Sequence, residues 1–386
     1  MNRPVIITAG GTGGHMFPAL ALAAELERSG RTVALACDER GARFLPEEMP
    51  WFKVRASSPS GSVGKRSSGI VRLGLGLLQS WWWLKRQRPL AVAAFGSYAS
   101  VPVGVAAGML KLPLLVHEQN AVLGRANRMI AKRASGLALT FAETERADMM
   151  SEDRQVVTGN PVRPEIRARA GEAYRLPGEG EPFELLVIGG SQGARALSDV
   201  LPAALDRLSG RERSRLRLTQ QCRPEDLERV EQAYKGLGFE AELKTFFEDL
   251  PERLAKAHLV ISRSGASSVA EMLALGRPSI LIPLPSSLEG DQLANARFVA
   301  EAEAGWLVEQ ADLTGEWLSE QLRLCLEQPD RLSTMAAKAK ALARPDAAEA
   351  LADAVERMVP GLKAGSKSSD TDGRGGGPGG SMEAAA

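Results

Sequence analysis

Two stretches of the chain open in the same way, and this repeat predicts an α/β fold of two Rossmann-like, doubly wound parallel-sheet domains that face a central cleft. In the first half, an apolar strand at Val5–Ala9 runs into Gly10-Gly11-Thr12-Gly13-Gly14-His15. In the second half, a strand at Phe183–Ile188 runs into Gly189-Gly190-Ser191-Gln192-Gly193-Ala194-Arg195. Strands and helices alternate after both turns, and 386 residues exceed what one core usually holds.

The first domain is predicted to span residues 1–160. A helix from about Phe17 to Ser29 follows the first turn, and the serine-, glycine- and lysine-rich segment Arg55–Gly69 is predicted to be a loop. Short apolar runs predict the remaining strands at Thr32–Cys37, Ala91–Phe95, Leu112–Val116, Gly136–Thr140 and Gln155–Thr158.

The second domain is predicted to span residues 161–343. After its glycine turn, strands are expected at Leu216–Thr219, Glu242–Thr245, Ala257–Ile261, Ser279–Pro283 and Gly305–Val308. A C-terminal helix is expected within residues 344–362. Residues 363–386 are rich in glycine, serine and charge, which is typical of a disordered tail.

The glycine turns predict where a ligand binds. Open α/β sheets bind ligands beyond the carboxyl ends of their strands, and glycine lets backbone amides approach a phosphate. The first turn is not a dinucleotide fingerprint, because Met16 stands where a third glycine is needed. Ser262–Glu271 predicts another strand, turn and helix, whose N-terminal amides suit a phosphate. A sugar hydroxyl would give Glu271 a partner. The alternative is an ordinary strand–helix–strand crossover in which Glu271 is solvated, and the same sequence pattern fits it.

Two polar groups at the predicted ligand edge could carry chemistry. His15 ends the first turn and can act as a base or a donor near neutral pH, or simply begin the helix. His117-Glu118-Gln119-Asn120 follows an apolar strand, where it could reach a ligand or form a satisfied loop network.

Ile70–Leu84 predicts an amphipathic helix with an unusually wide apolar band. Basic residues surround this band, which suits the headgroup level of an anionic membrane. The alternative is a core helix with an exposed basic end. The residues expected at the membrane are Leu77, Leu78, Trp81 and Trp82.

Composition limits the function classes. A net charge of +1 gives no general attraction for nucleic acid. The three cysteines show no CxxC spacing, which fits free thiols in a reducing compartment. The N-terminus does not read as a signal peptide, and no apolar run reaches the length of a membrane span. We expect a cytosolic protein, at most associated with a membrane.

Five motifs in order also carry a resemblance. Gly10–His15, His117–Asn120, Gly159–Arg163, Gly189–Arg195 and Ser262–Glu271, with Asp291, Gln292 and Asn295, resemble the lipid-linked N-acetylglucosaminyltransferases of bacterial peptidoglycan synthesis, which have the GT-B fold. The matching segments cover residues 4 to about 358.

The resemblance implies a reaction and a location. N-acetylglucosamine would pass from UDP-GlcNAc to the 4-hydroxyl of the MurNAc sugar of undecaprenyl-pyrophosphoryl-MurNAc-pentapeptide, with inversion at the anomeric carbon. No metal or other cofactor is expected, since the one Asp-x-Asp, Asp370-Thr371-Asp372, falls in the predicted tail. The implied partners are the donor, the undecaprenyl-linked acceptor and the anionic inner-membrane surface at its cytoplasmic face. Contacts with other cell-wall synthesis enzymes stay open.

The resemblance also implies residue roles. His15 is the first candidate for general base, with the acceptor pyrophosphate as its alternative partner, and Glu118 is the second candidate base. Glu271 would meet the ribose hydroxyls, Phe247 would address uracil through its backbone, and Gln292 would read the sugar. The implied substrate-binding residues are Thr12, Gly13, Gly14, Asn120, Arg163, Ser191, Gln192, Phe247, Ala266, Ser267, Ser268, Val269, Ala270, Glu271, Asp291 and Gln292.

The chain departs from the family pattern in two places. The second glycine turn usually reads Gly-x-Gly-Gly-Tyr, whereas here it is Ala94-Phe95-Gly96-Ser97-Tyr98. Asp291-Gln292 stands where two glutamines are common. Two rival functions share the fold and the donor: a hydrolysing UDP-GlcNAc 2-epimerase, and a non-catalytic UDP-sugar-binding protein. The tryptophan band argues against the epimerase.

Overall fold

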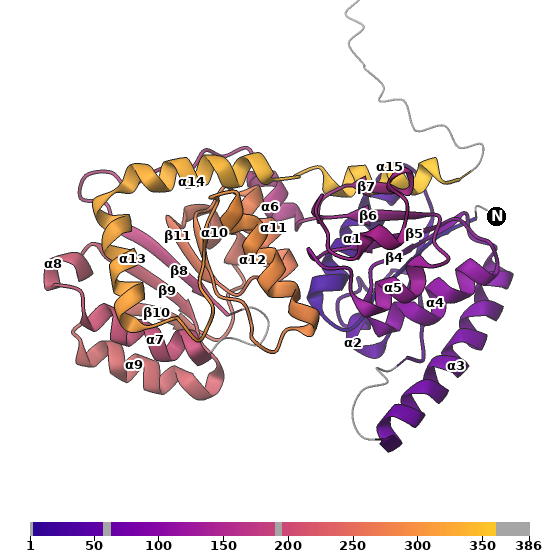
Figure 1. The fold of residues 1–386 in the computed structure, drawn as a ribbon, viewed down its shortest axis with the longest axis horizontal. Coiled ribbons are helices and arrows are strands. Elements are labelled where there is room, and N and C mark those ends of the chain that lie inside the picture. Colours follow the sequence, from indigo (N-terminus) through magenta and orange to yellow (C-terminus); the bar gives the residue numbers. More distant parts are fainter. Residues whose placement is uncertain (1–2, 57–62, 190–194, 360–386) are drawn as a thin grey trace, which may run out of the picture.

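The computed structural model describes residues 3–56, 63–189 and 195–359, and these ranges form two α/β domains side by side (Figure 1). The first domain holds a seven-stranded sheet in the order β3-β2-β1-β4-β5-β6-β7, with every pair parallel. Its strands are β1 (Val5–Thr8), β2 (Val33–Cys37), β3 (Trp51–Lys53), β4 (Ala91–Ala94), β5 (Leu114–Glu118), β6 (Gly136–Leu139) and β7 (Gln155–Val157).

Helices cover both faces of the first sheet because its strands are apolar on both sides. On one face, α1 (Gly13–Arg28) buries Met16 and Leu22 completely. On the other face, α3 (Val63–Gln87), α4 (Ser97–Met109) and α5 (Arg125–Ala131) bury Leu84, Val103 and Ile130. The short helix α2 (Glu39–Ala42) follows β2. Burial on both faces explains why these strands read as continuous apolar runs.

The second domain repeats this plan with a six-stranded parallel sheet in the order β10-β9-β8-β11-β12-β13. Its strands are β8 (Phe183–Ile188), β9 (Leu216–Gln221), β10 (Ala241–Lys244), β11 (Leu259–Ser262), β12 (Ser279–Leu281) and β13 (Trp306–Leu307). Counted from its own first strand, each sheet begins 3-2-1-4-5-6, which is the strand order of a dinucleotide-binding fold.

Two layers of helices sandwich the second sheet. One layer holds α7 (Arg195–Asp206), α9 (Leu227–Gly236) and α13 (Gly315–Glu327), which share one apolar core. The other holds α6 (Pro164–Arg169), α10 (Leu250–Lys256), α11 (Ala266–Ala274), α12 (Asp291–Glu301) and α14 (Pro329–Leu342). The short helix α8 (Gly210–Arg213) precedes β9.

The chain returns to the first domain at its C-terminal end. Helix α15 (Ala347–Arg357) packs beside α1, with Leu351 and Val355 fully buried in the core of the first domain (Figure 1). Arg31 Nε donates to Glu356 Oε1 at 2.8 Å across the same contact. The helix expected within residues 344–362 is therefore present, and it completes the first domain.

The predicted fold class is confirmed, and several boundaries differ. Helix α1 begins at Gly13 rather than near Phe17, so half of the first glycine turn is already helical. Helix α3 begins at Val63, inside the segment predicted to be a loop, and residues 57–62 of that segment lie outside the described ranges. Strand β3 was not predicted. Within the described chain, no helix is long and apolar enough to cross a membrane.

Candidate functional site

The site lies where the strand order of each sheet reverses. In the first domain, β1 and β4 are neighbours, and the glycine turns that follow them lie together at their carboxyl ends. Gly11 and Gly96 have φ values of 81° and 78°, which favour glycine. Ser97 also has a positive φ, 64°, at a position where the family pattern has glycine, and this costs about 1 kcal/mol. The serine therefore keeps the turn geometry while adding a side chain.

The first turn presents the N-terminus of α1 to the cleft. Thr12 is the N-cap, and its side chain makes no capping hydrogen bond, so it leaves first-turn amides for other partners. His15 lies in the first turn of this helix, and its Nδ1 is 3.0 Å from Gln119 Oε1 on the first-domain loop after β5. His15 is therefore a first-turn residue of the helix, as one of its two readings has it.

A second histidine, His117, contacts Gln119 from the side opposite His15. Gln119 Nε2 lies 3.0 Å from His117 Nδ1, and His117 Nε2 lies 3.0 Å from the carbonyl oxygen of Gly159. His117 is 1% exposed, and burial lowers its pKa to about 4. His117 is therefore neutral near pH 7.

Glu118 is a buried carboxylate with all its acceptor positions directed into the protein. Its Oε1 accepts from the backbone N of Asn120 at 3.0 Å and from the side chain of Asn120 at 3.2 Å. Its Oε2 accepts from Gly124 N at 3.0 Å and from Asn127 Nδ2 at 2.8 Å. Four donors hold Glu118 as the centre of a loop network, which was one of the two readings of this motif.

Asn120 connects the two domains. Asn295 Nδ2 donates to Asn120 Oδ1 at 3.0 Å and to the carbonyl of Ser264 at 3.0 Å, while Asn295 Oδ1 accepts from Ala121 N at 2.8 Å. Asn295 is fully buried. One amide of α12 thus aligns the loop after β5 with the loop after β11.

The stretch Ser264–Glu271 forms the wall opposite the first turn. Gly265 is the N-cap of α11, and the Ser267 hydroxyl lies 3.5 Å from the carbonyl of Gly14. Ala266 and Val269 are buried, whereas Ser267, Ser268 and Ala270 are partly exposed. The start of α11 therefore offers backbone and small side chains to the gap between the domains.

Glu271 has a protein partner that the sequence did not predict. Arg163 Nε and Nη2 donate to the two oxygens of Glu271 at 2.6 and 2.8 Å. Both residues had been placed at the nucleotide, one from the linker and one from α11, and the structure brings them together. This two-pronged geometry is specific to arginine.

Asp291 and Gln292 begin α12 close to these groups. Asp291 Oδ1 accepts from Gln292 N at 2.7 Å, and Gln292 Oε1 accepts from Leu284 N at 3.0 Å. Burial raises the pKa of the Asp291 carboxyl, and hydrogen bonds from the backbone of Gln292 and the side chain of Ser287 oppose part of that rise. One oxygen of each side chain is therefore engaged by the protein's own backbone.

Three further residues are predicted to bind the UDP-GlcNAc donor, and the structure describes only one of them. Phe247 is 4% exposed and lies beneath the guanidinium of Arg253, whose centre is 4.6 Å from the ring centroid. Only its backbone is left to address a ligand. Ser191 and Gln192 lie outside the described residues.

Comparisons with known proteins agree with this architecture. The model of the glycosyltransferase family 28 N-terminal domain matches residues 5–138, and that of the C-terminal domain matches residues 184–351. The UDP-N-acetylglucosamine--N-acetylmuramyl-(pentapeptide) pyrophosphoryl-undecaprenol N-acetylglucosamine transferase of Rhodospirillum rubrum is 48% identical over 92% of both chains. The chain belongs to glycosyltransferase family 28.

Solved structures of other proteins have a fold similar to that of this chain. The crystal structure of Acinetobacter baumannii MurG is 28% identical, with a TM-score of 0.76 over 92% of this chain and 100% of that one. A putative UDP-N-acetylglucosamine 2-epimerase from Listeria monocytogenes is 16% identical, with a TM-score of 0.66 over 92% of this chain and 96% of that one. The second likeness concerns the fold alone.

This member of family 28 also joins its domains through a carboxylate among arginines. Glu289 precedes α12 and accepts from Arg125 at 2.9 Å and from Arg128 at 2.9 and 2.8 Å, with Arg146 at 3.3 Å. These bonds lower the pKa of Glu289 to about 2. The arginines, with Tyr98 and Lys132, line a cavity of about 560 Å³. Sequence reasoning missed this cluster, because nothing in the spacing links residues 125–146 to residue 289.

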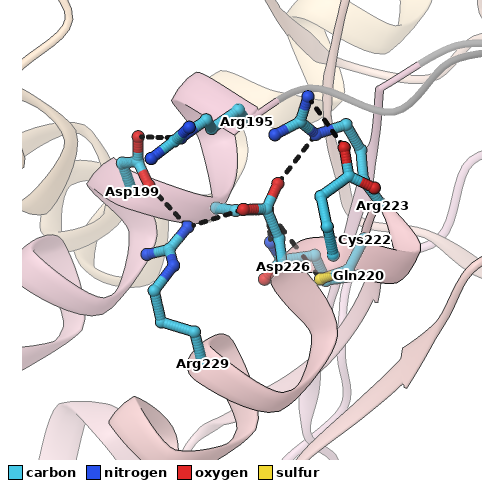
Figure 2. Close-up of polar contacts among 9 residues, drawn as sticks. Arg195, Asp199, Gln220, Cys222, Arg223, Asp226 and Arg229 are labelled. Atoms are coloured by element: carbon cyan, nitrogen blue, oxygen red, sulfur yellow. Dashed lines mark hydrogen bonds and ion pairs between the residues drawn. The ribbon is translucent and has the colours of Figure 1, made fainter.

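A second group of arginines lies at the carboxyl end of β9, beside the start of α7 (Figure 2). Asp226 accepts from Arg223 Nε at 2.8 Å and from Arg229 at 3.0 Å, and Arg229 also donates to Asp199 at 2.7 Å. Arg195 lies 3.7 Å from Asp199. Through Arg229, this network links α9 to α7.

The four residues of α3 that are expected at the membrane differ in their exposure to solvent. Leu78 and Trp82 are 69% and 65% exposed, whereas Leu77 and Trp81 pack against the core of the first domain. The exposed face therefore differs from the expected one. It consists of Val71, Leu75, Leu78 and Trp82, which we call the α3 stripe.

No metal site emerges from the described part of the chain. There, no three His, Cys, Asp or Glu side chains gather closely enough to hold a metal ion. Asp370 and Asp372 lie outside the described ranges.

Proposed function

We propose that this chain transfers N-acetylglucosamine from UDP-GlcNAc to the 4-hydroxyl of the MurNAc sugar of undecaprenyl-pyrophosphoryl-MurNAc-pentapeptide, making lipid II from lipid I in peptidoglycan synthesis. The family 28 relatives are named for this transfer. The observation that carries the proposal is the amide bridge from Asn295 of the second domain to Asn120 of the first, which joins the polar loop after β5 to the loop after β11.

The proposed chemistry is a single in-line displacement. The acceptor O4 gives its proton to His15 and attacks the anomeric carbon of the donor. The bond from that carbon to the β-phosphate oxygen breaks, and its electron pair leaves with UDP. Attack from the face opposite UDP inverts the anomeric configuration. Backbone amides at helix N-termini stabilise the charge on the leaving diphosphate.

We assign the base to His15 rather than Glu118. Both oxygens of Glu118 already accept two hydrogen bonds each, so it has no position for another proton donor. His15 has one ring nitrogen engaged by Gln119, which leaves the other to the substrate. A neutral imidazole is also suited to general-base work near pH 7.

On the donor side, we propose that the second domain holds UDP-GlcNAc. Ser191, Gln192 and the backbone of Phe247 address the nucleotide, and Arg163 with Glu271 lies along its ribose and diphosphate. Asp291 and Gln292 read the sugar together with Asn120. Thr12, Gly13 and Gly14 lie between donor and acceptor. The start of α11, Ala266 to Ala270, supplies the wall along the nucleotide.

The α3 stripe supports peripheral association with the anionic cytoplasmic face of the inner membrane. The stripe is apolar and exposed, and Arg72, Lys85, Arg86 and Arg88 flank it. This combination suits the headgroup level of an anionic bilayer, where a lipid-linked acceptor resides.

The test is a lipid II assay on three variants. His15→Asn should lower kcat by roughly 10² to 10⁴ while UDP-GlcNAc affinity is kept. Glu27→Gln, an exposed change on the same helix, is the matched control and should leave kcat unchanged. Full activity in both His15→Asn and Glu118→Gln would contradict the assignment of the base. Release of free ManNAc without lipid product would favour the epimerase instead.

A further inference from the structure

Three side chains form an unbroken line of hydrogen bonds from the carbonyl of Gly159, just after β7, to the ring of His15. We infer that His117 and Gln119 act as positioning residues that hold His15 as a single tautomer, with its proton on Nδ1 and a bare Nε2 turned to the substrate. The inference rests on the proposed role of His15 as base.

In the hydrogen bond between His117 and Gly159, only the histidine can be the donor. A backbone carbonyl can only accept, so His117 Nε2, 3.0 Å from Gly159 O, must carry a proton. Burial keeps the His117 ring neutral, so its Nδ1 has no proton and can only accept.

The orientation of the Gln119 amide is fixed independently. Gln119 Nε2 lies 3.1 Å from the carbonyl oxygen of His117 as well as 3.0 Å from His117 Nδ1. Both partners are acceptors, so the nitrogen of the amide must stand on this side. The amide oxygen then faces His15. Two acceptors agree on an assignment that either one alone would only suggest.

The protonation of His15 follows from the orientation of the Gln119 amide. Gln119 Oε1 can only accept, so His15 Nδ1 at 3.0 Å must donate. The bond that one ring nitrogen makes determines which nitrogen is protonated, so neutral His15 keeps its lone pair on Nε2. A base in the other tautomer would present an N–H to the sugar hydroxyl and could not take its proton.

The chain is suited to a direct test because it contains only three histidines. The third, His258, accepts at Nδ1 from the backbone N of Glu184 at 2.8 Å, so its proton is on Nε2. His117 also carries its proton on Nε2. Among the three histidines, His15 alone should therefore be the Nδ1–H tautomer.

The experiment is ¹⁵N NMR of the histidine rings of the unliganded full chain at pH 8, which lies above the ordinary pKa of a free histidine side chain. We expect one Nδ1–H and two Nε2–H spin systems, with the Nδ1–H set lost in His15→Asn. In Gln119→Leu, His15 should shift to a mixture of tautomers, kcat should fall at least tenfold, and KM for UDP-GlcNAc should change less than threefold. Gln119→Glu keeps an acceptor toward His15 and should retain its Nδ1–H signal.

The outcomes separate this inference from the proposed function. An Nε2–H His15 in the wild-type chain would overturn the inference, whatever the variants do. If the Nδ1–H signal is found but His15→Asn keeps full transferase activity, the positioning line stands and the role of His15 as base falls. Gln119→Leu with the wild-type tautomer would show that Gln119 does not set it.

Discussion

Arg163 and Glu271 meet in a two-pronged ion pair, with Nε–Oε1 at 2.6 Å and Nη2–Oε2 at 2.8 Å. Arg163 comes from the segment between the domains and Glu271 from α11, so the pair ties this segment to the proposed nucleotide wall. A ribose hydroxyl that donates to Glu271 would join a carboxylate already held in place. Preorganisation of this kind reduces the ordering cost of binding.

Glu271→Gln should therefore weaken donor binding and stability together. The amide keeps one acceptor oxygen and leaves Arg163 without its counter-charge, which should cost about 1 to 3 kcal/mol of the free energy of unfolding. KM for UDP-GlcNAc should rise roughly tenfold, equivalent to about 1.4 kcal/mol. Urea unfolding and donor titration measure the two effects.

A double variant separates these effects. Arg163→Met added to Glu271→Gln removes the unpaired cation, so stability should recover in part while donor binding stays weak. Glu181→Gln, which breaks an exposed pair with Arg175, is the matched control and should change neither quantity measurably. Unchanged donor affinity in Glu271→Gln would remove the ribose assignment.

Much of this site could be predicted because it depends on local backbone demands. Gly11 and Gly96 lie at turns that need positive φ, and the apolar runs before them are buried strands. The strand Trp51–Lys53 escaped prediction because it is a short edge strand with two exposed side chains, so it has no buried run. The parts that sequence reasoning missed depend on tertiary pairing between distant residues. No sequence neighbour of Glu289 or Arg128 indicates that the two residues pair. In the sequence, Gln119 has the features of an ordinary loop residue, and only the structure shows its contact with His15.

Glu289 should make stability depend on pH in the acid range. Three arginines lower its pKa from 4.5 to about 2, so the carboxylate is favoured in the folded state. The stabilisation is complete above about pH 4.5 and is lost at about 1.4 kcal/mol per pH unit as the pH falls toward 2. Glu289→Gln should lower Tm at pH 7, and its difference from wild type should shrink between pH 4.5 and pH 3.

Thermal unfolding from pH 7 to pH 3 checks this expectation. Glu39→Gln, which breaks the exposed and solvent-screened pair with Lys53, is the control and should show a much smaller pH dependence. A difference between Glu289→Gln and wild type that stays constant across this range would contradict the role of ionised Glu289.

The α3 stripe gives a prediction for membrane binding. Leu78→Ser with Trp82→Ser removes two exposed apolar side chains, each worth roughly 1.5 kcal/mol on transfer from water. Affinity for vesicles containing anionic phospholipid should fall about a hundredfold in co-sedimentation, which corresponds to about 3 kcal/mol. UDP-GlcNAc affinity should not change, because the stripe lies on α3 and the proposed donor site lies in the second domain.

The control for this pair is an equally exposed aromatic residue elsewhere. Phe246 is 69% exposed in the second domain, so Phe246→Ser should leave vesicle binding intact. Leu77 and Trp81 pack on the core, and their replacement would confuse a loss of folding with a loss of membrane contact. Undiminished vesicle binding by the α3 double variant would exclude the stripe as the membrane surface.

The return of α15 to the first domain predicts that a change near the C-terminal end destabilises the N-terminal half. Leu351 is fully buried against α1 and the first sheet, although more than 300 residues separate it from α1 along the chain. Leu351→Ala should cost about 2 to 5 kcal/mol of the free energy of unfolding, because it leaves a cavity there. Hydrogen exchange should quicken at the backbone amides of α1, including those of Ala23 and Leu26. Asp353→Ala, an exposed change on the same helix, should leave exchange in α1 unaltered. If Leu351→Ala instead quickens exchange only in the second domain, α15 does not belong to the cooperative unit of the first.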